Sequence, residues 1–482
     1  MKRTLYFDED SDARFYQFEA GTMTKFDLDA ILENLSKTSV GVYIVGVNAQ
    51  IANFRNSVFQ SYLDGFDIRL GPYQPALRGD ARHWSFRRRA NMAVLEAQGI
   101  DSNAYLLSGA RGLGMGAWID VRMNDMHNGH DENSQIHTDF WRDHPELRIP
   151  GNIPCENGFD YSHACIRDMY ADFIVEAFEK YKPDNVLLDW MRWPAHLPRE
   201  TGPERAHLIT DMLKKLRDRL GQPFACRVPV TPESALKLGL DVKSWVEAGV
   251  LSHLFVGNFG CGGNFDVPVE RWRTIVGKLP VIVTLEEGWR REVKYRGAVI
   301  TPEDARGLAA GAYWSGADGL QVFNCMKMLR PPLSSDLLKK SADPSEQLGY
   351  IAKGRQIFNE VQDPDIVTSR PRRVHPGWDD CEIYLGDLDQ CNRIPGYYEN
   401  WLRTHKLPRG VFPASGETVW RLRIGKAPSG DARLFTDAEG KILVNGHETC
   451  GPEPILVPHA WLRDGVTEVK TFSKVTHLYM EL

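Results

Sequence analysis

Short apolar runs recur through the first two-thirds of this chain, with helical patterns or long loops between them. Runs of this kind are typical of strands that are buried on both faces of a parallel sheet. They cover residues 3–8, 40–47, 115–122, 185–189, 224–230, 251–256, 281–285 and 319–323. The helical patterns cover residues 27–37, 82–110 with a break at Gly99, 162–181, 203–220, 241–248 and 302–315. Eight strands alternating with helices predict an α/β fold, a (β/α)8 TIM barrel over residues 1–365.

An open, doubly wound sheet is the alternative for this region. The phosphate-binding glycine pattern that would support it does not follow the first predicted strand. The composition changes after about residue 365, where short alternating segments and turn residues such as Asn445-Gly446 appear. Residues 370–376 resemble a linker. We therefore expect a C-terminal β-sandwich over residues 366–482.

Composition narrows the class of protein. Hydrophobic residues make up 42% and charged residues 25% of the chain, and the net charge is −6. That charge argues against nucleic acid as a partner, and no apolar run approaches the ~20 residues of a membrane span. The first residues lack an apolar signal segment, so we expect a cytoplasmic protein, or a secreted or periplasmic one if a signal was removed. Eight scattered cysteines without a CxxC pair predict no zinc ribbon, and no cofactor is expected.

The fourth strand is the most informative one for function. The helical pattern over 162–181 ends at Lys182-Pro183, and the strand over 185–189 follows almost at once. That strand ends in Asp189, and Trp190, Arg192 and Trp193 come next. Strand ends carry the chemistry of (β/α)8 barrels, and aromatic rings bind the apolar faces of sugars. This segment predicts one wall of a sugar-binding active site.

Glycoside hydrolysis requires two carboxylates on separate strands, one as an acid and one as a nucleophile or base. Asp189 on the fourth strand and Glu286 on the seventh are the predicted catalytic pair. Glu287 competes with Glu286, because successive strand residues face opposite sides and only one of them enters the lumen. Glu286 is preferred because it is closer to the strand. The alternative for either acid is a structural ion pair with a neighbouring arginine.

The third strand ends in a dense polar segment, Arg122-Met-Asn-Asp-Met-His127. Asp125 is a third candidate acid or base. Arg122 and Asn124 suit sugar hydroxyls or a substrate carboxylate. The predicted substrate-binding residues are Arg122, Asn124, His127, Trp190, Arg192, Trp193, Arg227, Asn258, Trp289 and Asn324.

Four histidines follow the third strand, at positions 127, 130, 137 and 144. Their spacing matches no familiar zinc signature, and histidine also binds sugars without a metal. No metal is expected. A metal-dependent sugar lyase or isomerase that uses the loop 125–144 remains an alternative function.

Three segments carry a resemblance to a known group: Arg122-Met-Asn-Asp, His144-Pro-Glu-Leu and Leu187-Leu-Asp-Trp-Met-Arg-Trp-Pro194. On these motifs, roughly residues 1–330 resemble glycosyl-hydrolase-like (family-10-like) TIM-barrel proteins. The resemblance implies a (β/α)8 barrel, action on carbohydrate, Asp189 as the acid of the fourth strand and Arg192 as its neighbour. The chain departs from the group at Asp184-Asn185, where Asp-Gly is usual. The C-terminal sandwich is similar to accessory domains beside such barrels.

These observations together predict a glycoside hydrolase that acts on an oligosaccharide or glycoside through Asp189 and Glu286. A carbohydrate-binding barrel without catalysis is the alternative from another class, because a fold alone does not establish an activity. The expected partner is a carbohydrate. The sequence leaves the sugar, the linkage and the oligomeric state open.

Overall fold

The structure is a computed structural model. It describes residues 2–10, 13–16, 18–77, 82–127, 129, 131–150, 157–198, 200–258, 263–286, 300–323, 344–377 and 416–482.

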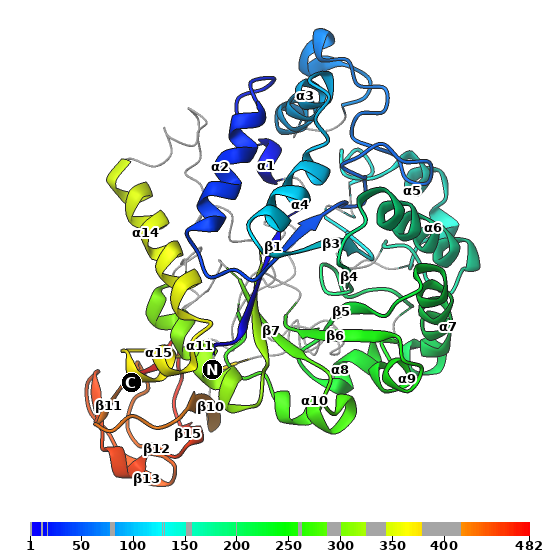
Figure 1. Cartoon of the computed structure of the whole chain (residues 1–482). Coiled ribbons are helices and arrows are strands. Elements are labelled where there is room, and N and C mark those ends of the chain that lie inside the picture. The colour runs from blue at the N-terminus through cyan, green and yellow to red at the C-terminus, as the bar shows by residue number, and fades with distance from the viewer. Residues whose placement is uncertain are drawn as a thin grey trace.

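The first two-thirds of the chain form a closed barrel of eight parallel strands in sequential order, and β8 pairs with β1 to close it (Figure 1). Its strands are β1 (Thr4–Glu9), β2 (Val42–Gly46), β3 (Gly116–Arg122), β4 (Asn185–Asp189), β5 (Phe224–Val228), β6 (Leu251–Val256), β7 (Val281–Glu286) and β8 (Gly319–Phe323). The predicted (β/α)8 barrel is confirmed, and the doubly wound alternative is wrong because the sheet closes on itself.

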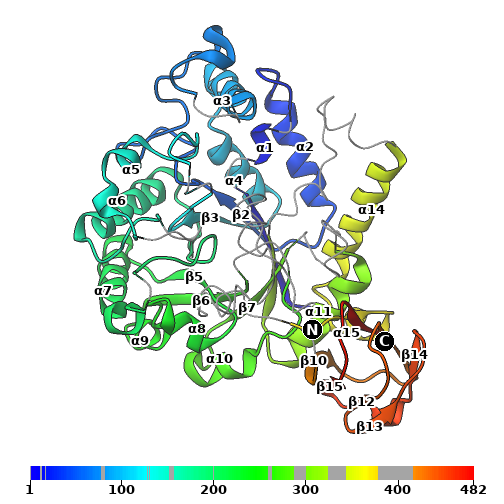
Figure 2. The same ribbon diagram turned by 180° about the vertical axis from the view of Figure 1, so that it is seen from behind.

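Helices surround the barrel, as Figure 2 shows from behind. The α-helices are α1 (Ala13–Tyr16), α2 (Lys25–Ser36), α3 (Arg82–Ala97), α4 (Ser102–Gly112), α5 (Asp139–Asp143), α6 (Ala164–Tyr181), α7 (Gly202–Leu220), α8 (Pro232–Lys237), α9 (Val242–Glu247), α10 (Val269–Val276), α11 (Pro302–Trp314), α14 (Pro344–Glu360) and α15 (Pro364–Ser369). Short 3-10 helices lie at Ile68–Tyr73, Pro145–Leu147 and His459–Trp461.

The unit α6–β4 shows how local sequence places the site. Lys182 ends α6 in the left-handed conformation, and Pro183 cannot extend the helix. Asp184 then accepts a hydrogen bond from the backbone N–H of Ala117 at 2.7 Å, which ties the turn to β3. All five residues of β4 are buried. Asp189 is therefore delivered to the carboxyl end of a strand that packing holds on both faces.

The C-terminal part of the chain forms two antiparallel sheets of four strands, as expected of a β-sandwich. One sheet has the order β10 (Thr418–Gly425), β15 (Gly465–Thr471), β12 (Ile442–Val444) and β13 (His447–Thr449). The other has the order β14 (Ile455–Val457), β11 (Ala432–Thr436), β16 (Leu478–Glu481) and β9 (Arg373–Val374). The segment 370–376 is more than the predicted linker, because β9 lies in it and pairs with β16.

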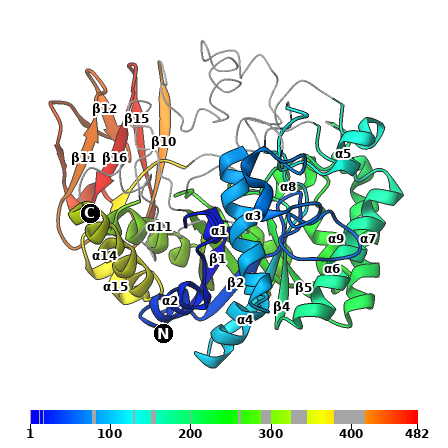
Figure 3. The ribbon, with the colours of Figure 1, turned by 90° about the horizontal axis from the view of Figure 1, so that it is seen from above.

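The sandwich packs on α11 at one side of the barrel (Figure 3). The backbones approach closely there: a Cβ added to Gly311 of α11 would lie 2.6 Å from the carbonyl oxygen of Arg423 in β10. Buried side chains of the barrel and the sandwich belong to one continuous apolar core. In the described part of the chain, no helix combines the length and apolar character needed to cross a membrane.

Candidate active site

An apolar floor closes the lower half of the barrel lumen. It consists of one inward-facing cluster, Tyr6, Val42, Ile44, Trp118, Leu187, Ala225, Phe255 and Ile282. The ring of Tyr6 packs edge-on against Trp118 at 5.4 Å and Phe255 at 5.1 Å between centroids. This cluster is separate from the core between strands and helices, as expected for layered side chains inside a barrel.

A polar layer lies directly above the floor. Side chains alternate along a strand, so the residue two positions after each floor residue also faces the lumen. The layer contains Asp8, Asp120, Asp189, Arg227, Thr284 and Gln321, each no more than 3% exposed. Gln321 donates to Asp8 at 2.6 Å and accepts from the Thr284 hydroxyl at 2.7 Å. Charged groups are therefore built into the interior of the barrel below its mouth.

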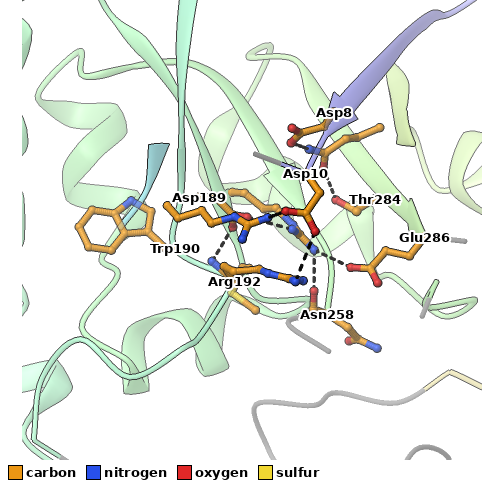
Figure 4. Close-up of polar contacts among 12 residues, drawn as sticks. Asp8, Asp10, Asp189, Trp190, Arg192, Asn258, Thr284 and Glu286 are labelled. Atoms are coloured by element: carbon orange, nitrogen blue, oxygen red, sulfur yellow. Dashed lines mark hydrogen bonds and ion pairs between the residues drawn. The ribbon is translucent and has the colours of Figure 1, made fainter. Parts of the chain in front are cut away.

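One guanidinium joins the two predicted catalytic carboxylates. Arg227 on β5 lies 3.1 Å from the Asp189 Oδ2 and 3.4 Å from the Glu286 Oε1, and it donates to the carbonyl oxygen of Asn258 at 2.8 Å (Figure 4). The other Asp189 oxygen accepts a hydrogen bond from the backbone N–H of Met191 at 2.7 Å. Burial disfavours the charge on Arg227, but Asp189 and Glu286 outweigh it and raise its pKa. The Arg227 guanidinium therefore links Asp189 and Glu286.

A second charged cluster forms the rim between β1, β3 and β4. Arg122 donates to Asp10 at 2.5 Å and to Asp125 at 2.7 Å. Asp125 also contacts the Nδ1 of His127, whose Nε2 lies 3.1 Å from Arg192. Arg192 reaches Asp10 at 3.8 Å, which closes the ring of contacts (Figure 4). The rim is therefore one network of charged side chains that hold each other in place.

The two rim carboxylates are held in their charged form. Burial acts to raise the pKa of Asp10, but Arg122 and Arg192 outweigh it, and its pKa falls below the usual range. Burial likewise opposes the charge on Asp125, yet His127 and Arg122 lower its pKa well below the usual range. Asp125 is completely buried and makes two such contacts, so it is placed to orient Arg122 and His127.

Two of the carboxyl groups of the polar layer, Asp8 and Asp120, behave in the opposite way. Burial raises the pKa of Asp8 well above its usual range, and the charge of Asp189 adds to the shift. Burial also raises the pKa of Asp120, with Asp8 and Asp189 as further causes. Arg122 and Arg227 only partly offset these effects. Both groups therefore favour the protonated form more strongly than an ordinary aspartate does.

The structure does not bring every predicted residue to the lumen. Trp190 faces away from Asp189 and is fully buried, packed against Trp245 and His196 outside the strands (Figure 4). The amide of Asn124 bonds to the backbone of residues 159 and 195, which fixes two loops. Asn258 contributes its carbonyl oxygen to Arg227. Glu287, Trp289 and Asn324 lie outside the described residues.

Trp193 and His127 lie at the outer edge of the rim. Their rings meet edge-on at 5.4 Å, and the indole N–H of Trp193 lies 3.3 Å from the His127 Nδ1. The side chain of His127 is 39% exposed, whereas that of Arg122 is 3% exposed. His127 is therefore the more exposed part of this network, and Trp193 beside it is half-buried.

The histidines that follow β3 do not converge. His137 stacks on Trp141 at 4.0 Å and contacts Gln50, and His144 pairs with Glu146 at the surface. His130 lies outside the described residues. Over the described ranges, no group of three histidine, cysteine, aspartate or glutamate side chains is arranged to hold a metal ion.

Sequence reasoning missed Asp120, Thr284 and Gln321 as parts of the lumen. A signal for Asp120 was present, because it lies two residues before Arg122 and must share its face of β3. The same alternation separates Trp190 from Asp189.

The sequence matches no family model and no curated protein. Solved structures with some likeness include a noncanonic maltogenic α-amylase from Thermotoga neapolitana, with a TM-score of 0.39 and 10% identity over 99% of this chain and 98% of that one. An endo-β-1,4-mannanase from Thermotoga petrophila has a TM-score of 0.44 and 10% identity over 98% and 91%. An α-amylase from Malbranchea cinnamomea has a TM-score of 0.37 and 12% identity over 98% and 96%. Likeness at this level does not bear on the chemistry of the site.

Proposed function

We propose that the chain is a glycoside hydrolase in which Asp189 and Glu286 are the two catalytic carboxylates. The observation that carries this is their common attachment to Arg227 on the lumen side of β4 and β7. Both lie at carboxyl ends of barrel strands, where (β/α)8 enzymes keep their active sites. Two carboxylates from separate strands are the groups that this reaction needs.

The contacts favour different roles for the two acids. Each oxygen of Asp189 has a donor, the N–H of Met191 or the guanidinium of Arg227, and both donors stabilise a negative charge. Asp189 suits the nucleophile, or the base that activates water. Glu286 has the longer contact to Arg227, at 3.4 Å, and suits the acid that protonates the departing oxygen.

The rim would position the sugar. Trp193 offers an aromatic face, and Arg192 offers N–H donors beside Asp10. The buried network of Asp10, Arg122 and Asp125 holds these groups in place. Rigid placement of this kind is what makes a bound glycoside reactive.

The direct test uses Asp189→Asn and Glu286→Gln with a panel of aryl glycosides and oligosaccharides. Each change should lower kcat by about 10²–10⁴-fold while binding of the same sugar persists. Asp211→Asn on the surface of α7 is the control and should keep full activity. An activated leaving group should restore turnover to Glu286→Gln and not to Asp189→Asn.

Full hydrolysis by both amide variants would show that the pair is wrong. Sugar binding by the wild-type protein without hydrolysis of any glycoside in the panel would favour the non-catalytic barrel instead.

A further inference from the structure

Two buried carboxyl groups in the same polar layer as Asp189 have no role in the proposed reaction. Asp8 on β1 and Asp120 on β3 face the lumen and are 0% and 1% exposed. The Oδ1 atom of each is buried without a hydrogen-bond partner among the described residues. Asp8 has one donor, the Gln321 amide, at 2.6 Å. Within the same part of the chain, no hydrogen bond reaches the Asp120 side chain.

A carboxylate in this position is strongly disfavoured unless it takes up a proton, because water is excluded and donors are few. The charged groups that face Asp8 and Asp120 come from three strands: Arg122 on β3, Asp189 on β4 and Arg227 on β5. Both guanidiniums are already engaged with other carboxylates, Arg122 with Asp10 and Arg227 with Asp189. Burial is the largest cause for both groups and Asp189 adds to it, with Asp8 as a further cause for Asp120, so the pKa of each group is raised.

We propose that Asp8 and Asp120 form a proton-holding pair in the same layer of the lumen as Asp189, and that they act as positioning residues which add no negative charge beside it. Since this role is defined through Asp189, it rests on the proposed function. The pair touches no substrate. When Asp8 and Asp120 are protonated, Arg227 pairs with Asp189 and Glu286 alone. When either of them loses its proton, Arg227 is shared with a further negative charge.

The consequence is a loss of activity at alkaline pH. Removal of a proton from the pair places a new negative charge in the layer that contains Asp189. Arg227 is attracted to Asp8 and Asp120 as well as to Asp189 and Glu286. The new charge therefore competes for the guanidinium that holds the catalytic acids together.

Unfolding by guanidinium chloride tests the protons without any substrate. The pKa of Asp120 is higher in the folded protein than the ~4 of an unfolded chain, so the folded state binds more protons between these two pH values. The wild-type protein should therefore lose stability relative to Asp120→Asn as pH rises above about 4. Asp125→Asn is the matched control from the same strand end and should behave oppositely, because the pKa of Asp125 is lowered. A stability difference that does not change with pH would overturn the proposal.

Asp8→Asn provides a second variant with the same expected direction, and it keeps an oxygen that can accept from Gln321. The wild-type protein supplies a measurement that needs no variant: infrared spectra at pH 7 in deuterated water should show the carbonyl band of protonated carboxylic acids. Absence of that band would overturn the proposal.

The pH profile of hydrolysis tests the link to Asp189. Asp120→Asn should retain turnover and should move the alkaline limb of kcat/KM to higher pH, which a purely structural residue would not do. An unchanged limb, even with the expected unfolding data, would overturn the positioning role. If no glycoside is hydrolysed by the wild-type protein, the proposed function fails, whereas the unfolding and infrared data still decide whether the pair holds protons.

Discussion

Asp120 in the barrel lumen and Asp304 at the contact between α11 and the sandwich are equally buried, at 1% exposed, yet their pKa values are shifted in opposite directions. Asp304 accepts from His375 at 3.0 Å and from Arg373 at 3.3 Å. Burial opposes its charge, but His375 and Arg373 outweigh burial and lower its pKa. Asp120 has no such donors, and its pKa is raised. Burial alone does not set the state of a carboxyl group; the donors around it do.

The same comparison distinguishes a contact that stabilises the fold from the group of acids assigned to the proposed reaction. At the α11 contact, Asp304 has two cationic or ring N–H partners of its own, Arg373 and His375. In the lumen, one guanidinium, Arg227, serves two acids at once. Unsatisfied groups are rare in a protein interior, and they are expected where chemistry outweighs stability.

Removal of the lumen guanidinium should have the largest effect on stability. Arg227→Met leaves Asp189 and Glu286 buried without their shared cation, and we expect a loss of about 3–5 kcal/mol in the free energy of unfolding. Denaturant titration at pH 7 measures it, with Arg227→Lys as the charge-preserving control. A loss below about 1 kcal/mol would mean that the lumen acids do not depend on this charge.

Asp304→Asn should cost less, about 2–3 kcal/mol at pH 7, because the contacts to His375 and Arg373 lose their charge but keep an acceptor. The sign with pH follows from the lowered pKa: the wild-type advantage is full above about 4 and is lost as pH falls through the folded pKa. Thermal unfolding should therefore show a constant difference between the two proteins above about pH 4 and a shrinking difference at more acid pH. Divergence toward acid pH would contradict the contrast with Asp120.

The smallest effect should come from a steric change without charge. Gly311→Ala places a methyl group 2.6 Å from the Arg423 carbonyl oxygen and should cost about 1–3 kcal/mol. Gly112→Ala at the end of α4 is the matched control, since a Cβ there meets nothing within 4 Å. Calorimetry of both variants separates the contact from the general effect of glycine replacement. Equal melting temperatures would show that the sandwich yields at this contact.

Periodicity made most of the barrel predictable. The strands at 185–189, 251–256 and 319–323 have the observed bounds, and the break at Gly99 between α3 and α4 was expected from the glycine, whose φ is +74°. Period-two and helical apolar patterns are local, so a single sequence contains them. The carboxyl ends of the strands follow directly, which placed Asp189 and Glu286 on the correct side of the barrel.

The contacts within the site were not predictable in the same way. The side-chain amide of Asn124 donates to the backbone carbonyl oxygens of residues 159 and 195. These residues come close to Asn124 only when the loops have folded. Arg227 bridges two acids because β5 lies beside β4 and close to β7, and no local pattern contains that geometry. The family-10-like resemblance and the division of the chain at residue 365 remain predictions.

The apolar floor below the polar layer has one more consequence. The eight residues of the floor carry no charged side chain, so they supply no counter-charge beneath Asp8, Asp120 and Asp189. The charge balance of the lumen is therefore set from one side, by Arg227 in the polar layer and Arg122 in the rim.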